Sequence, residues 1–138
     1  MRKRVVIVGG GAAGLMAAIS AAENGADVLV LEKMPAPGRK ILITGKGRCN
    51  FTNRCEIADF PKFFPNNGAF LYSALRAFDN QDLIDFLAAH GVPSKVERGG
   101  RLFPVSDKAA DVVDALVKTA RQTGVRIQTS RPVQSIRV

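Results

Sequence analysis

The sequence predicts an α/β fold in which crossover helices connect the strands of a parallel sheet. Two short apolar segments, residues 5–8 and 27–32, flank an apolar stretch of helical length, and a third segment follows an amphipathic helix near the carboxyl end. Continuous apolar runs rich in β-branched residues are typical of strands buried on both faces of a parallel sheet. At 138 residues the chain is long enough for a single core, so we expect one domain over 1–138.

Composition narrows the classes of protein without assigning a function. The apolar and charged fractions, 46% and 23%, are those of an ordinary globular protein. The formal net charge of +8 suits a nucleic-acid partner, but the basic residues are scattered and no helix-turn-helix, zinc or RNP pattern occurs, so we expect none. A phosphate-binding protein, or a fragment cut from a longer and more acidic chain, has the same charge.

Two features argue against export and a membrane location. The apolar run over residues 5–22 follows a basic start, as in a signal peptide, but four glycines crowd residues 9–14, and glycine is a poor helix former in water. Cys49 and Cys55 are too few for a disulfide framework, and their spacing suits no common metal site. We therefore expect reduced thiols, no metal, and a cytoplasmic protein with no membrane contact.

The amino-terminal residues predict one βαβ unit. A strand over Val5–Val8 leads into a helix over Ala12–Asn24, and Gly25 is placed to end that helix in a left-handed conformation. A second strand over Asp27–Glu32 completes the unit, whose crossover should be right-handed.

Glycines at positions 9, 11 and 14 form a G-x-G-x-x-G motif between the first strand and its helix, which is the context this motif requires. Gly9 allows the tight turn, Gly11 lets backbone approach a pyrophosphate, and Gly14 lets the helix pack closely against the strand. Phosphates would then lie on the N–H groups of Gly11, Ala12 and Ala13, at the positive end of the helix dipole.

The pattern continues beyond the glycines with Ala18, Val28 and Glu32. The small side chain of Ala18 keeps the helix close to the sheet, and Val28 faces the core. Glu32, at the end of the second strand, is placed to accept hydrogen bonds from the adenosine ribose hydroxyls. Its carboxylate disfavours NADP by repelling the extra phosphate, although the neighbouring Lys33 weakens that effect. The sequence thus predicts a site for the ADP half of a dinucleotide, and we expect FAD.

The remaining elements follow from helical spacing and turn residues. Residues 33–67 have little periodicity and much glycine, proline and asparagine, which is typical of a functional loop. The expected elements are a helix over 69–78, a helix over 81–90 capped by Asn80 and ended by Gly91, a hairpin formed by 94–97 and 101–103, a helix over 107–123 capped by Ser106 and closed by Gly124, a third strand over 125–128 and a fourth over Val133–Val138.

Two longer segments resemble a bacterial flavoprotein family. Gly38–Asn53, which reads GRKILITGKGRCNFTN, and Glu97–Ala109, which reads ERGGRLFPVSDKA, closely resemble segments of the BaiN/YhiN-type, or aminoacetone-oxidase-like, NAD(P)/FAD-dependent oxidoreductases. The resemblance covers essentially the whole chain. It implies a Rossmann-like, glutathione-reductase-type FAD-binding domain that is incomplete at the carboxyl end, because members of the family are considerably longer.

The resemblance also implies roles for residues outside the glycine motif. Lys33, Arg39 and Lys40 would lie near the cofactor, the segment from Thr44 to Asn50 would run toward the flavin ring, and the backbone of Val133 would face the adenine. Together with the glycine motif, the expected cofactor-binding residues are Gly9, Gly11, Ala12, Ala13, Gly14, Glu32, Lys33, Arg39, Lys40, Thr44, Gly45, Gly47 and Val133.

The same loop has an interpretation that does not need the family. N–H groups near Gly45 and Gly47 would approach the flavin pyrimidine or N5, and Arg48 or Lys46 would stabilise negative charge on a reduced flavin, unless they are solvated loop residues. Five residues separate the two cysteines, one more than in the redox disulfide of glutathione-reductase-like enzymes, so we expect no catalytic dithiol. His90 is expected to interact with carbonyls at a helix end.

These observations lead to one functional hypothesis with alternatives. We expect an FAD-dependent oxidoreductase that accepts hydride from NAD(P)H and passes it to an unidentified acceptor, with catalytic residues unknown. The alternatives are a non-catalytic nucleotide-binding module or inactive truncated fragment, and a nucleic-acid-binding protein such as a flavoprotein that modifies tRNA.

Overall fold

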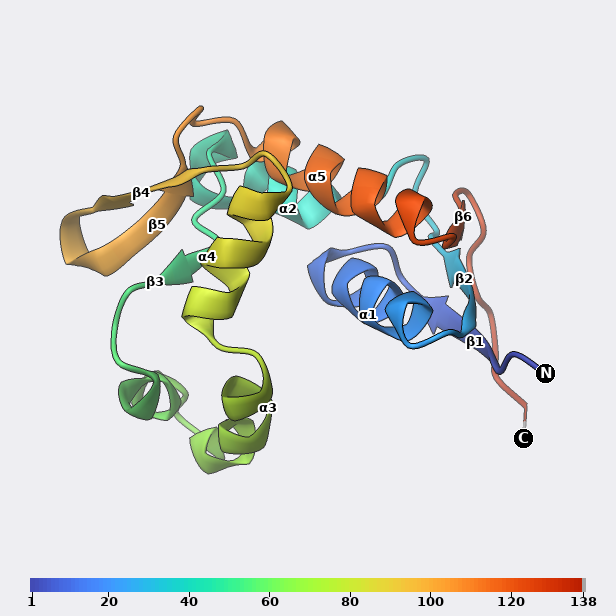
Figure 1. Cartoon of the computed structure of the whole chain (residues 1–138), viewed down its shortest axis with the longest axis horizontal. Coiled ribbons are helices and arrows are strands. Elements are labelled where there is room, and N and C mark those ends of the chain that lie inside the picture. The colour runs from blue at the N-terminus through green and yellow to red at the C-terminus, as the bar shows by residue number, and fades with distance from the viewer. Residues whose placement is uncertain (138) are drawn as a thin grey trace.

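The computed structural model describes residues 1–137 and contains one parallel and one antiparallel sheet (Figure 1). The elements are β1 (Arg4–Val8), α1 (Ala12–Glu23), β2 (Asp27–Leu31), α2 (Arg39–Ile43), β3 (Thr52–Asn53), α3 (Tyr72–Ala77), α4 (Asn80–Ala89), β4 (Ser94–Glu97), β5 (Arg101–Pro104), α5 (Ala109–Gln122) and β6 (Arg126–Gln128). Short 3₁₀ turns occupy Ile57–Phe63 and Gly68–Leu71, and turns that contain residues with positive φ occupy Thr44–Gly47 and Arg98–Gly100. The expected α/β fold with a parallel sheet and crossover helices is confirmed.

The parallel sheet has the strand order β1-β2-β6, and α1 and α5 pack on one of its faces. Val28 and Val30 of β2 point into the core with Leu15 of α1 and Leu116 of α5, all of them buried. The pairing of β1 with β2 runs from Arg4 opposite Asp27 to Val8 opposite Leu31. Because this register brings strand ends together, the turn after β1 lies beside the turn after β2.

The expectation that the first strand is buried on both faces is wrong. Val6 and Val8 are 50% and 56% exposed, whereas Val5 and Ile7 pack against the core. The reason is that β1 is an edge strand and both helices that pack on this sheet lie on the face that carries Val5 and Ile7. A continuous apolar run therefore does not by itself show that both faces are covered.

Local stop signals are confirmed, whereas two expected caps are wrong. Gly25, Gly91 and Gly124 each lie two residues after the end of α1, α4 and α5 respectively, with φ of +84°, +85° and +91°. The cap of α4 is Asp79 rather than Asn80, because the Asp79 carboxylate accepts from the N–H of Asp82 and the Asp82 side chain accepts in return.

The last long helix begins later than expected. Ser106 does not cap it, since α5 starts at Ala109 after an uncapped Lys108, and Asp107 has φ +58°. Asp107 is the expected first residue of this helix, but its carboxylate instead forms ion pairs with Arg48 and Lys95. The expected helix over 69–78 is likewise split into a 3₁₀ turn and the shorter α3.

The expected fourth strand is wrong for residues 133–137, which form no strand, and Val138 lies outside the described residues. After β6 the chain turns across the end of β2, where Ser130 N–H donates to the Met34 carbonyl and Arg131 N–H donates to the Glu32 carbonyl. These bonds carry Val133 toward the end of the sheet and leave residues 133–137 without a ladder among the described residues.

The second sheet has the order β3-β5-β4 and contains the expected hairpin. Its turn requires Gly99 and Gly100 at φ +77° and +73°, and a Cβ on Gly100 would lie 2.8 Å from Oδ1 of Asn53. The segment expected as a long loop, 33–67, contains α2, β3 and two short turns. Within residues 1–137, no helix combines the length and apolar character needed to span a bilayer.

Candidate functional site

An open groove of about 760 Å³ runs along the amino-terminal end of α1. It is lined by the first turn of α1, the segment after β2, and α2 with the residue that follows it. The lining residues are Gly11, Ala12, Glu32, Lys33, Met34, Gly38, Arg39, Lys40, Ile41, Ile43 and Thr44. The structure thus brings most of the residues expected to bind a cofactor into one groove.

A smaller hollow of about 260 Å³ continues the groove across the carboxyl ends of β1 and β2. Glu32 and Lys33 line both the groove and the hollow, so the two spaces are neighbours. The hollow is otherwise lined by Val8, Gly9, Leu31, Arg131, Pro132 and Val133. Residues distant in sequence, from Gly9 to Val133, therefore meet in a continuous path that leads past the start of α1 to Thr44.

The first turn of α1 faces this path with backbone N–H groups that no side chain caps. Gly11, the residue before the helix, supplies no side-chain cap, and the first turn carries no acidic side chain. The leading N–H groups of a helix have no intrahelical partner and lie at the positive end of its dipole, so they favour an anion. A Cβ on Gly11 would meet no atom within 4 Å, because this backbone borders open space.

Gly14 has the opposite surroundings. A Cβ there would lie 2.0 Å from the carbonyl oxygen of Gly9 and 3.4 Å from a methyl of Ile7 in β1. Only glycine lets α1 approach the loop and strand this closely. Gly14 therefore positions the helix N-terminus and does not itself face the groove.

Glu32 is buried and its carboxylate ties two backbone segments together. Oε2 accepts from the N–H of Gly10 at 2.7 Å, and Oε1 accepts from the N–H of Met34 at 2.7 Å. Each carboxylate oxygen can accept further hydrogen bonds. Besides facing the groove, Glu32 thus holds the glycine loop against the end of β2, a role that its sequence position did not reveal.

Gly10 is one of the residues of the site that sequence reasoning missed, as are the groove residues Met34, Gly38, Ile41 and Ile43. It is buried, its N–H donates to Glu32, and its carbonyl accepts from the N–H of Gly38 at 2.8 Å. A Cβ at Gly10 would lie 3.1 Å from Cβ of Pro37 and 3.3 Å from Oε2 of Glu32. The motif treats position 10 as variable, and the only available signal was the run of three glycines.

Gly38 sets the position of α2 beside the groove. Its φ is +74°, and a Cβ there would lie 2.7 and 2.8 Å from the two methyls of Val113 in α5. This close packing places Arg39 and Lys40, both exposed, along the groove wall. Their positive charges, with that of Lys33, make the groove favourable for phosphate.

The turn Thr44–Cys49 begins at the end of the groove and has an unusual backbone conformation. Gly45, Lys46, Gly47 and Cys49 all have positive φ, between +55° and +85°. Thr44 Oγ1 donates to the Ile41 carbonyl, and the N–H of Cys49 donates to the Thr44 carbonyl at 3.0 Å. Gly45 and Gly47 do not line the groove themselves, but follow Thr44 at its edge.

A separate apolar cavity of about 380 Å³ lies on the other side of this turn, among α1, α4 and α5. Ala13 lines that cavity and not the groove, whereas Ala12, Ile41 and Thr44 border both spaces. The thiol of Cys49 also faces it, and burial raises the pKa of this thiol above its ordinary value.

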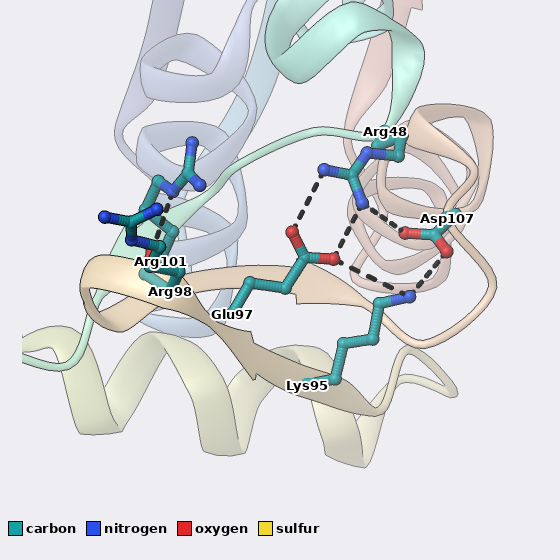
Figure 2. A network of polar contacts seen from close by, with 6 residues as sticks. All are labelled: Arg48, Lys95, Glu97, Arg98, Arg101 and Asp107. Atoms are coloured by element: carbon teal, nitrogen blue, oxygen red, sulfur yellow. Dashed lines mark hydrogen bonds and ion pairs between the residues drawn. The ribbon is translucent and has the colours of Figure 1, made fainter.

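Arg48, Lys95, Glu97 and Asp107 form a compact group of alternating charges, the Arg48 cluster (Figure 2). The guanidinium donates to both oxygens of Glu97, at 2.7 and 3.1 Å, and to Asp107 at 3.1 Å. Lys95 pairs with Asp107 and lies 3.9 Å from Glu97. The Arg48 guanidinium lies over the ring of Phe103, 4.1 Å from its centroid.

These contacts change the expectation for Arg48. Its hydrogen bond to Glu97 raises the pKa of Arg48 further, and the carboxyl pKa values of Glu97 and Asp107 are lowered by Arg48 and Lys95 respectively. The two cations and two anions balance, so Arg48 does not offer an unneutralised charge to a cofactor. Within residues 1–137, Lys46 forms no ion pair and is exposed.

The remaining candidates have simpler surroundings. Cys49 is buried, Cys55 is half-buried, and both are free thiols. His90 lies directly after α4, with Nδ1 2.7 Å from the Phe86 carbonyl, so its expected interaction at a helix end is confirmed.

Comparison with known proteins places the chain in a family. A family model described as the HI0933-like protein Rossmann domain matches residues 3–138. The chain belongs to the HI0933-like family. This confirms the resemblance carried by segments 38–53 and 97–109, and makes the chain a member of a family of FAD-dependent oxidoreductases.

Curated relatives are similar over nearly all of the chain. A 3-dehydro-bile acid delta(4,6)-reductase of Clostridium scindens is 38% identical over 137 residues, which cover 98% of this chain and 33% of the relative. A ribosomal RNA dihydrouridine synthase of Escherichia coli is 36% identical over 131 residues, which cover 95% of this chain and 32% of the relative. The chain thus spans about a third of the length of these relatives.

Solved structures share the fold. A 3-ketosteroid-delta4-(5alpha)-dehydrogenase from Rhodococcus jostii superposes with a TM-score of 0.66 at 20% identity, over 93% of this chain and 38% of that one. A flavocytochrome c3 fumarate reductase in its open conformation gives a TM-score of 0.61 at 19% identity, over 94% of this chain and 27% of that one. At these identities the likeness establishes the architecture alone.

Proposed function

We propose that this chain forms the dinucleotide-binding part of a cytoplasmic FAD-dependent oxidoreductase that accepts hydride from NAD(P)H and passes it to a further acceptor. The observation that carries the proposal is the uncapped N-terminus of α1 at the middle of a groove that ends at Glu32 and Val133 on one side and at Thr44 on the other. The family membership supports FAD as the dinucleotide.

The residues of the groove fit the parts of FAD in order. In this proposal the N–H groups of Gly11, Ala12 and Ala13 bind the pyrophosphate, because α1 begins there without a cap and a Cβ on Gly11 would only fill open space. The charges of Lys33, Arg39 and Lys40 neutralise the phosphates. Glu32 faces the adenosine ribose while it holds the loop through Gly10, and Gly9 and the backbone of Val133 border the adenine.

The turn Thr44–Gly47 would lie at the flavin end, where backbone N–H groups and the exposed Lys46 face the ring. FAD supplies the hydride chemistry when it is bound, and the chain supplies binding, orientation and the local charge. Gly14 contributes indirectly, because it allows α1 to reach this position.

Flavin binding and reduction test this proposal. The chain is purified, loaded with FAD, and its visible flavin spectrum and dissociation constant are measured, before and after anaerobic addition of NADH or NADPH. Retained flavin that is bleached by either nucleotide supports an oxidoreductase. Retained flavin that neither nucleotide bleaches identifies a non-catalytic module or inactive fragment, and absence of binding contradicts the assignment.

RNA is a second candidate for the acceptor, favoured by one relative and by one surface. The Escherichia coli relative carries the name ribosomal RNA dihydrouridine synthase, and this chain has a net charge of +8. Phe63 and Phe70 are 73% and 86% exposed in the segment between β3 and α4, drawn in green in Figure 1, where Arg54 and Arg76 are also exposed. Exposed aromatic rings and arginines within one segment suit unstacked RNA bases.

Salt dependence separates RNA from a small apolar acceptor such as the bile acid named for the Clostridium relative. RNA binding predicts an affinity for a single-stranded RNA that falls steeply between low and physiological salt, and that weakens in a Phe63→Ala, Phe70→Ala variant. Negligible RNA binding at low salt removes this candidate.

A further inference from the structure

The Arg48 cluster joins three segments that are far apart in the sequence. Arg48 lies 49 residues from Glu97 and 59 residues from Asp107, and all three side chains meet between the groove turn, the hairpin and the start of α5 (Figure 2). The two motifs that carried the family resemblance therefore touch through these side chains. Further bonds link the same segments, from Phe51 N–H to the Leu102 carbonyl and from Arg54 N–H to the Gly100 carbonyl.

The turn held by this cluster needs external support. Lys46 and Cys49 are not glycines, yet both have positive φ, a conformation that side chains disfavour and that persists only where surrounding contacts impose it. Inside the turn, Arg48 N–H donates to the carbonyls of Gly45 and Thr44, and Cys49 N–H donates to the Thr44 carbonyl at 3.0 Å. Contacts with the hairpin and the burial of Cys49 in the core supply further order.

Phe103 is the point of contact between the turn and the hairpin. It is fully buried, a Cβ on Gly45 would lie only 3.0 Å from its ring, and the Arg48 guanidinium lies 4.1 Å from the ring centroid. The turn thus packs against Phe103 at Gly45, and Arg48 packs on the same ring. Glu97 and Asp107 fix the guanidinium from the side.

We propose that Arg48 is a positioning residue, and that the Arg48 cluster holds the turn Gly45–Gly47 in place directly after Thr44, at the edge of the flavin end of the groove. The inference rests on the proposed function for the identity of the ligand. It assigns the cluster no net charge toward the cofactor, since Arg48 and Lys95 are balanced by Glu97 and Asp107. Lys46 and backbone N–H groups then supply the positive field at that end.

The geometry also explains why an arginine is needed at this position. One planar guanidinium binds both oxygens of Glu97, reaches Asp107 and stacks on Phe103 at the same time. A lysine keeps the charge but cannot make the bidentate contact or the planar stacking. Lysine at position 48 should therefore restore only part of the order.

The first test measures order in the turn without any ligand, from the reactivity of the Cys49 thiol. In a Cys55→Ser background, the rate of modification by a thiol reagent is compared for wild type, Arg48→Gln and Arg48→Lys, with circular dichroism to confirm folding. Arg98→Gln is the matched control, because Arg98 is exposed on the same hairpin and outside the cluster. Since Cys49 is 4% exposed, we expect roughly tenfold faster modification in Arg48→Gln, a smaller increase in Arg48→Lys and none in the control.

The second test asks whether loss of order in the turn affects ligand binding at the flavin end of the groove alone. Dissociation constants of FAD and of ADP are measured for the same variants. Arg48→Gln should weaken FAD by about tenfold and leave ADP within about twofold, because ADP occupies the end of the groove formed by Gly11 and Glu32. A loss of general fold would weaken both ligands equally.

The two tests distinguish failure of this inference from failure of the proposed function. If wild type binds neither FAD nor ADP, the proposed function is wrong, while the Cys49 rates still report on the cluster. If Arg48→Gln leaves Cys49 as unreactive as in wild type, or if FAD and ADP weaken in parallel, Arg48 does not position the turn. Should Arg48→Gln prove unstable, Glu97→Gln provides the same comparison with an intact arginine.

Discussion

The same substitution at two glycines three residues apart should separate binding from folding. Gly11→Ala introduces a Cβ that meets no atom within 4 Å at a residue whose φ of −82° suits alanine. Alanine is less favourable than glycine before a helix, so we expect a loss of stability below about 1 kcal/mol. In the proposed complex this Cβ occupies the space where the pyrophosphate approaches the backbone.

For Gly14→Ala the structure predicts the reverse. The new Cβ would lie 2.0 Å from the Gly9 carbonyl oxygen, where ordinary contact begins at 3.4 Å, so backbone must move by about 1.4 Å. Forced overpacking of this kind costs about 3 kcal/mol or more, at the upper end of the usual range. For a chain of this size that lowers Tm by roughly 12 °C, at about 4 °C per kcal/mol.

Thermal unfolding and FAD titration measure both effects on the same samples. Gly11→Ala should keep Tm within about 4 °C of wild type and weaken FAD by roughly tenfold to a hundredfold or more, as expected when charge-assisted hydrogen bonds to phosphate are lost. The main effect of Gly14→Ala should be the lower Tm. Undiminished FAD affinity in Gly11→Ala, or an unchanged Tm in Gly14→Ala, would show that the helix N-terminus has been placed incorrectly.

Three further predictions concern the supports of the groove. Glu32→Ala should weaken FAD binding less than Gly11→Ala does. It should also destabilise the fold by about 2 kcal/mol, measured by chemical denaturation, because the N–H groups of Gly10 and Met34 lose their acceptors. A variant as stable as wild type would contradict the role of Glu32 in joining these two segments. Gly38→Ala should lower Tm for two reasons: residue 38 has φ +74°, and the new Cβ would lie 2.7 Å from a methyl of Val113. Adding Val113→Ala should recover only the part of the Tm loss that comes from this clash. The carboxyl pKa values of Glu97 and Asp107 lie below their ordinary 4.5 and 3.8, so the contribution of the Arg48 cluster is complete above about pH 4.5 and is lost as the pH falls through the lowered values. Acid titration of Cys49 reactivity with a disulfide reagent that works at low pH should show this opening in wild type but not in Glu97→Gln, and a flat profile would count against the cluster.

Local sequence patterns determined much of the site. Gly9, Gly11 and Gly14 are spaced by the geometry of one strand, one turn and one helix, so their roles follow from neighbours in the sequence. The meeting of Gly11 and Glu32 in the groove follows from the same βαβ order, because the carboxyl ends of parallel strands lie on one edge. The stop signals at Gly25, Gly91 and Gly124 are equally local.

The late start of α5 has a long-range cause. Local spacing assigns Asp107 to the start of α5, whereas its carboxylate pairs with Arg48 across 59 residues, which moves the helix start to Ala109. Local propensity is worth only fractions of a kcal/mol per residue, so a charged contact formed in the folded chain overrides it.

The sequence by itself therefore determined the family and the glycine turn between β1 and α1, since these depend on glycine spacing and on two continuous motifs. Only the tertiary structure decided that β1 keeps one face exposed, that Gly10 joins Glu32 to Gly38, and that Arg48 is neutralised by the hairpin. The physical reason is that burial and ion pairing are set by which segments meet in space, and residues distant along the chain carry no local signal of that meeting.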